Sequence, residues 1–154
     1  MSTSNQYQLY SNALKKQALN PVGLNKSINN THEADGYNAS CGDEITIYLE
    51  LDNIDNTVNN ISFETDSCAI CRASASLMCQ SVKSLTLNES VKIKNKLLAM
   101  LNAEESEDLK FITKVDLQPL SPVSQFPSRV NCALLPWETL MNAYNNKSNR
   151  SALK

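Results

Sequence analysis

The feature that most constrains the fold is a strictly alternating segment at residues 44–51, followed by a polar connection and a second strand-like segment. In EITIYLEL, polar and apolar side chains alternate with a period of two, which is the pattern of a strand with one buried face. The connection that follows is rich in Asn and Asp, and the segment VNNISFETD comes after it. A connection of this kind favours an antiparallel hairpin. The sequence therefore predicts two paired strands whose outer ends lie side by side.

In most of the remaining chain, the apolar residues have helical spacing or no regular spacing. A short helix is expected within residues 7–18, since Asn20-Pro21 and Gly23 stop the pattern. Further helices are expected at residues 69–83, at residues 87–101 with Thr86 or Asn88 as the cap, and from Pro127 onward, with Pro136 kinking or dividing the last one. Residues 24–40 are predicted to be a loop, and residues 103–125 an excursion outside the core.

Composition excludes several classes of protein. The chain has 154 residues, of which 42% are hydrophobic and 19% charged, so a single domain spanning residues 1–154 is expected. No apolar run approaches the ~18 residues that cross a bilayer, so the sequence predicts no membrane association. The net charge is −2 and the basic residues are scattered, which argues against nucleic acid as a partner. No secretory signal is recognisable, so a cytoplasmic location is expected.

The cysteines are placed at the ends of the predicted elements. In a reducing compartment, cysteines outside the core are more often metal-binding or catalytic than disulfide-bonded. Cys41 lies just before the first strand of the hairpin and Cys68 just after the second, so antiparallel pairing brings them together. Cys132 lies near the start of the last helix, and Asp43 follows Cys41 after Gly42, whose backbone freedom allows both side chains to face one atom.

These residues suggest a metal site. Three thiolates and one carboxylate would complete a tetrahedral zinc site or a cradle for an iron–sulfur cluster, because soft sulfur ligands select both. Cys68 is expected at a helix N-terminus, where the helix dipole favours a thiolate. The stretch Cys68–Cys71 is a CxxC motif and allows two other interpretations: a dithiol redox centre, or a four-cysteine zinc site with Cys41 and Cys132.

Other residues that bear chemistry have simpler interpretations. Cys79 shares a helical face with apolar residues and is expected in the core. His32 is the only histidine, and a solvated position in a polar loop is expected for it. Trp137 and Tyr144 on the last helix are expected to be core residues.

Four motifs in this order carry a resemblance to a known family: Asn20-Pro21 with Gly23, ASCGDEI, SCAICRASASLM and SQFPSRVNCALLPWETL. They closely resemble the iron–sulfur cluster assembly family of IscU and the N-terminal domain of NifU, and especially its SufU branch. The IscU branch has a histidine where this chain has Asn131, and the long segment between Cys68 and Cys132 resembles SufU. The resemblance implies an α+β fold, a small antiparallel sheet with helices packed on one side.

The resemblance also implies a ligand set and a function. Cys41, Asp43, Cys68 and Cys132 match the positions that form one metal site in that family, whereas Cys71 falls where relatives usually lack cysteine. Resemblance to SufU implies a zinc-bound protein that accepts persulfide sulfur from a pyridoxal-phosphate cysteine desulfurase and passes it to downstream iron–sulfur assembly proteins. The chemistry would be sulfurtransferase-like thiol exchange, with Cys132 as the acceptor. The alternative is a scaffold on which a [2Fe–2S] cluster is built and transferred.

Overall fold

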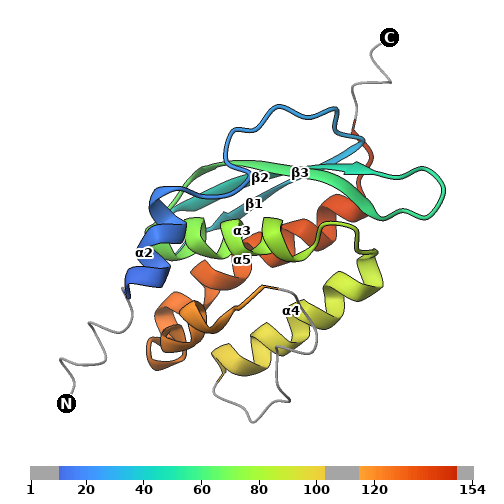
Figure 1. Cartoon of the computed structure of the whole chain (residues 1–154). Coiled ribbons are helices and arrows are strands. Elements are labelled where there is room, and N and C mark those ends of the chain that lie inside the picture. Colours follow the sequence, from blue (N-terminus) through green and yellow to red (C-terminus); the bar gives the residue numbers. More distant parts are fainter. Residues whose placement is uncertain (1–10, 103–114, 149–154) are drawn as a thin grey trace.

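The computed structural model describes residues 11–102 and 115–148, which form a three-stranded antiparallel sheet with helices packed on one of its faces (Figure 1). The α+β architecture expected from the resemblance is therefore confirmed. The elements, in chain order, are α2 (Asn12–Leu19), β1 (His32–Asn38), β2 (Asp43–Leu51), β3 (Val58–Asp66), α3 (Ala69–Ser81), α4 (Leu87–Leu101), the 3-10 helix η2 (Gln118–Gln125) and α5 (Pro127–Tyr144).

The predicted hairpin is the pair β2–β3, and β2 is the central strand. Alternate side chains of β2 are buried, as the period of two requires, and Ile47 lies opposite Phe63. The prediction of a loop over residues 24–40 was wrong for its second half. Residues His32–Asn38 form β1, an edge strand that pairs antiparallel with β2.

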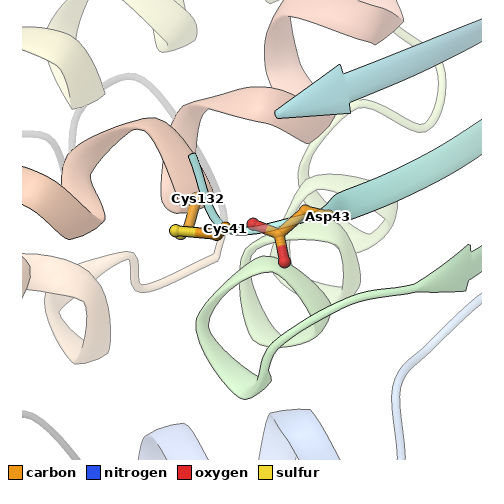
Figure 2. A group of neighbouring side chains, drawn as sticks. All are labelled: Cys41, Asp43 and Cys132. Carbon is orange, nitrogen blue, oxygen red and sulfur yellow. The ribbon is translucent and has the colours of Figure 1, made fainter. Parts of the chain in front are cut away.

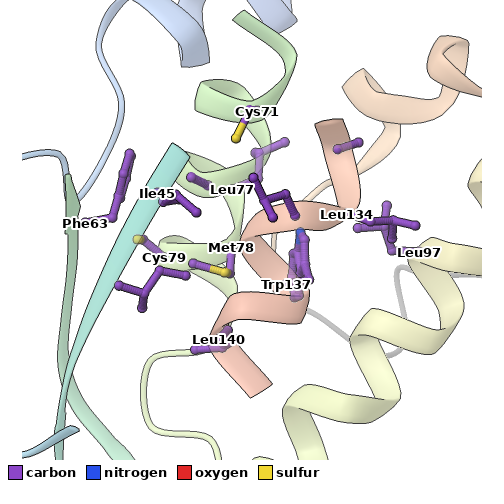
Figure 3. Close-up of a cluster of buried hydrophobic side chains, with 14 of the residues drawn as sticks. Ile45, Phe63, Cys71, Leu77, Met78, Cys79, Leu97, Leu134, Trp137 and Leu140 are labelled. Carbon is purple, nitrogen blue, oxygen red and sulfur yellow. The ribbon is translucent and has the colours of Figure 1, made fainter. Parts of the chain in front are cut away.

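Helices α3 and α5 lie beneath the sheet, and α4 packs against α5 on the side away from it (Figure 1). Trp137 of α5 has no exposed surface and donates a hydrogen bond from Nε1 to Ser74 Oγ of α3 at 3.0 Å. Figure 3 shows this indole among buried side chains of α3, α4 and α5. Tyr144 is also buried, so both aromatic residues are in the core as predicted.

Helix boundaries agree closely with the sequence patterns. The helix α4 begins after Thr86, whose hydroxyl accepts from the Glu89 amide while the Glu89 carboxylate accepts from the Thr86 amide, a complete capping box. The helix α5 continues through Pro136 as one helix, so the division considered at that residue does not occur. For the first helix, residues 7–10 lie outside the described residues and α2 ends at Leu19.

The segment at residues 103–125 was predicted to lie outside the core, and for its described part this was wrong. Leu117, Leu120 and Val123 are all buried, with exposed fractions of 1%, 0% and 0%. They place η2 against α4 and α5. Residues 103–114 lie outside the described residues. Within the parts of the chain that the structure describes, no helix is both long and apolar enough to cross a membrane.

The strand β1 packs against α5 at Gly36. A Cβ atom at this position would overlap Thr139 Oγ1 and lie 3.1 Å from Leu135 Cδ1. Rotation of Thr139 gives little relief, because its own Cβ would also be 3.1 Å away and its hydroxyl donates to the Leu135 carbonyl at 2.8 Å. Glycine is therefore required here for the strand to touch the helix.

We expect Gly36→Ala to lower the free energy of unfolding by about 1–3 kcal/mol, the usual cost of overpacking a core. Urea denaturation of the metal-free protein measures this change. The double variant Gly36→Ala/Thr139→Ala is the control, since removal of the threonine hydroxyl and methyl should restore part of the loss. If Gly36→Ala were as stable as wild type, β1 and α5 would have room for a side chain at residue 36.

Candidate metal centre

The β1–β2 turn presents Cys41 at the end of the sheet. Asn38 and Asp43 face each other across the two strands, and residues 39–42 connect them. The amides of Cys41 and Gly42 donate to the Asn38 carbonyl at 3.3 and 2.8 Å, which closes the turn. Gly42 has φ +71°, a left-handed conformation that glycine adopts without a steric cost. The turn therefore exposes Cys41 and directs Asp43 inward.

Asp43 joins the start of β2 to the start of α3. Its side chain is 1% exposed, and Oδ1 accepts a hydrogen bond from the Cys68 backbone amide at 2.9 Å. Cys68 is the N-cap residue of α3 and its side chain makes no capping bond, so Asp43 supplies an acceptor at this helix end. The other carboxylate oxygen, Oδ2, lies 3.9 Å from Cys68 Sγ.

Cys132 enters the site from α5. It has no exposed surface, and its Sγ donates to Cys41 Sγ at 3.1 Å. Burial raises the pKa of the Cys132 thiol well above its ordinary value, and the hydrogen bonds to Cys41 and Asp43 act in the same direction. Pro136, one turn later, has no N–H to donate to the Cys132 carbonyl, so the helix lacks that hydrogen bond next to the site.

The ligand atoms of Cys41, Asp43 and Cys132 all lie within 4.8 Å of one another (Figure 2). In a tetrahedral zinc site with zinc–sulfur bonds of about 2.3 Å, neighbouring ligand atoms are roughly 3.8 Å apart. The 3.9 Å between Cys68 Sγ and Asp43 Oδ2 is close to that spacing, whereas the 3.1 Å between Cys41 Sγ and Cys132 Sγ is shorter, so these two thiols would move apart around a metal ion. The donor set therefore fits a small, sulfur-preferring metal ion.

Of the four residues that the sequence singled out, the structure groups Cys41, Asp43 and Cys132, and it places Cys68 beside Asp43. The other candidates lie elsewhere. Cys71 and Cys79 are buried among core side chains, burial raises the pKa of each thiol to about 12, and neither belongs to the group of ligand atoms around Cys41, Asp43 and Cys132. His32 begins β1, about 20 Å along the strand from Asn38, at the end of the sheet away from the site. It is a strand residue that contacts Thr31 Oγ1, so the loop expected around it was wrong.

Sequence reasoning missed one residue of this centre. The Asn38 side chain is 9% exposed and its Nδ2 lies 3.4 Å from Asp43 Oδ2 and 3.6 Å from Cys132 Sγ. The only sequence signal was its position just before the turn that carries Cys41, in a segment predicted to be a loop.

Comparison with known proteins identifies the family. The model of the NifU-like N terminal domain matches residues 10–149. The chain belongs to this family. The "Zinc-dependent sulfurtransferase SufU" of Bacillus subtilis is 32% identical over 133 residues, which cover 86% of each chain. The "Iron-sulfur cluster assembly scaffold protein IscU" of Thermotoga maritima is 33% identical over 135 residues, covering 88% of this chain and 92% of the relative.

Solved structures of NifU-like proteins share the fold. One is a putative iron–sulfur cluster assembly scaffold protein for the SUF system from Fervidobacterium islandicum, with a TM-score of 0.76 and 29% identity over 88% of this chain and 96% of that one. The N-terminal part of a nitrogen-fixing NifU-like protein from Brucella abortus superposes with a TM-score of 0.79. At 20% identity over 92% of this chain and 95% of that one, it supports the fold alone.

Proposed function

We propose that this NifU-like chain is a zinc-dependent sulfurtransferase of iron–sulfur cluster biogenesis. In this proposal it accepts persulfide sulfur from a cysteine desulfurase and passes it to downstream assembly proteins in the cytoplasm. The observation that carries the proposal is the convergence of Cys41, Asp43 and Cys132 within 4.8 Å, in a chain 32% identical to a named zinc-dependent sulfurtransferase.

We assign Cys41, Asp43, Cys68 and Cys132 as the zinc ligands. The 3.9 Å contact between Cys68 Sγ and Asp43 Oδ2 supports Cys68 as the fourth member of the set. Zinc, when bound, keeps its cysteine ligands deprotonated at neutral pH. This matters most for Cys132, because burial otherwise favours its protonated thiol. Asp43 contributes the only oxygen donor, the harder ligand among the sulfurs.

The transfer step is thiol exchange. A cysteine thiolate of this chain attacks the outer sulfur of the desulfurase persulfide. A sulfur–sulfur bond forms on this chain, the one on the enzyme breaks, and the desulfurase cysteine leaves as a thiolate. No external oxidant or reductant is consumed in this step.

Exposure distinguishes the two thiols that lie side by side. Cys41 is exposed whereas Cys132 has no exposed surface, so an incoming persulfide meets Cys41 first. Cys132 remains the acceptor predicted from the sequence, and in that role it requires the site to open at the β1–β2 turn. The 3.1 Å separation also permits sulfur to pass from one thiol to the other.

The second candidate function is a scaffold for a [2Fe–2S] cluster. It is favoured by the 33% identity to the Thermotoga maritima protein named as a scaffold, and the same sulfur donors suit both occupants. Asn131 favours the transfer function, because an asparagine here cannot supply the histidine ligand that the resemblance to IscU would require.

The proposal is tested with the purified protein and its cognate desulfurase, given cysteine and a reductant. We expect a colourless protein with about one zinc per chain that raises the rate of sulfide release, because removal of the persulfide regenerates the enzyme thiolate. A brown protein that contains iron and acid-labile sulfide and leaves the desulfurase rate unchanged would instead establish the scaffold function.

A further inference from the structure

Asn38 is the buried polar side chain that contacts two of the assigned ligands. It is the last residue of β1, and its side chain faces the same side of the sheet as Asp43, its partner in the strand register. Its Nδ2 lies 3.4 Å from Asp43 Oδ2 and 3.6 Å from Cys132 Sγ. The amide thus spans the space between β2 and α5, the two elements that must stay together for the donors to converge.

The orientation of this amide is fixed by its other end. The Ser40 backbone N–H donates to Asn38 Oδ1 at 3.3 Å, and this donor requires the oxygen on that side. The nitrogen, which carries two hydrogens, is therefore directed at the carboxylate and the sulfur, both of which are acceptors when ionised. The main chain of Asn38 also accepts the Cys41 and Gly42 amides that form the turn.

The Asp43 carboxylate needs such a partner. Its Oδ1 is bonded to the Cys68 amide at 2.9 Å, so Oδ2 is the oxygen that faces the thiols. A donor beside Oδ2 restricts rotation of the carboxylate and offsets repulsion between its charge and a neighbouring thiolate.

We propose that Asn38 is a positioning residue of the metal centre, whose amide N–H holds Asp43 and Cys132 in ligand geometry. The inference rests on the proposed function, since it assumes that these two side chains bind metal. In metal sites, groups that hydrogen-bond the ligands typically contribute about 10- to 100-fold to affinity.

The variant Asn38→Asp separates this role from that of a turn residue. It keeps the size of the side chain and the oxygen that accepts from Ser40, but replaces the donor with a charged oxygen beside Asp43. Asn60→Asp is the matched control, because Asn60 Nδ2 also donates to a carboxylate on the neighbouring strand, Glu50 Oε1 at 3.1 Å, on the face of the sheet opposite the helices.

Zinc affinity is measured by competition with a chromophoric chelator, using the full chain. We expect Asn38→Asp to bind zinc about 10- to 100-fold more weakly than wild type, and Asn60→Asp to bind it equally well. Asn38→Ala, which removes the donor without adding charge, should weaken binding by about 10-fold and serves if Asn38→Asp fails to fold. Thermal unfolding of the metal-free variants reports whether the fold is retained.

Cobalt(II) substitution supplies a readout that a structural role would not change. Displacement of Cys132 or Asp43 should alter the thiolate-to-cobalt absorption and the visible ligand-field bands in the Asn38 variants only. Wild-type affinity and an unchanged cobalt spectrum in both Asn38 variants would overturn the inference. Tight zinc binding by wild type without sulfur transfer would refute the proposed function alone, whereas no zinc binding by wild type would overturn both.

Discussion

Cys132→Ala is expected to reduce the stimulation of the cognate desulfurase to the background rate of the enzyme alone. Cys132 is the proposed acceptor, and the methyl group of alanine cannot attack the persulfide in its place. Cys132 is also the only one of the assigned thiols that is carried by α5, so its removal leaves that side of the site without a donor. The measurement is sulfide release per minute at saturating cysteine, with and without the variant.

Two further variants make this result specific. Cys71→Ala removes a buried thiol of the same chain that burial keeps protonated, with a pKa of about 12, and should retain most of the stimulation. Cys41→Ala tests the exposed thiol and should also abolish stimulation if incoming sulfur reaches that residue first. Equal stimulation by wild type and Cys132→Ala would exclude Cys132 as the acceptor.

The parts of the fold that were predicted correctly are those with local signals. The alternation in β2 and the Asn/Asp-rich connection were sufficient to predict the β2–β3 hairpin. The start of α4 was predicted with Thr86 or Asn88 as the cap, and the structure shows Thr86 in a capping box whose hydrogen bonds both form within four residues.

The strand β1 was missed because its stability is not local. The segment HEADGYN has little apolar character, so no alternation is visible in it. Its backbone is satisfied by pairing with β2, and Gly36 lets it touch α5. Both contacts are tertiary, so the pattern of residues within a short segment of the sequence does not reveal them.

The candidate site, like the fold, was predicted only in part from the sequence. The hairpin explains why Cys41 and Cys68 lie at one end of the sheet. Cys132 was a candidate ligand from its position near a helix start, and its role as acceptor came from the family resemblance. Asn38 was not predicted to lie in the site, because the direction of a side chain cannot be predicted for a residue assigned to a loop. The burial of Cys132 beneath an exposed Cys41 depends on how α5 packs under the β1–β2 turn, which spacing does not specify.

We expect the protein to lose nearly all of its zinc when any one of Cys41, Asp43, Cys68 or Cys132 is replaced by alanine. In the proposed assignment each supplies one donor of a four-coordinate site, and the loss of a ligand should weaken zinc binding by more than the about 10- to 100-fold that loss of an outer-shell partner causes. Zinc per chain is measured by elemental analysis after gel filtration. Cys71→Ala and Cys79→Ala should keep the wild-type content, because both side chains are buried in the core.

Variants of Asp43 separate the loss of zinc from the loss of stability, because its two carboxylate oxygens have different roles. Asp43→Ala removes both the proposed ligand and the acceptor for the Cys68 amide, so the metal-free variant should also lose about 0.5–2 kcal/mol of stability, the usual cost of a lost helix cap. Asp43→Asn keeps the Oδ1 acceptor but not the charge, so it should lose zinc with little change in metal-free stability. If Cys71→Ala lost zinc as fully as Cys68→Ala, the assigned ligand set would be wrong, and Cys68 and Cys71 would instead act as a CxxC pair.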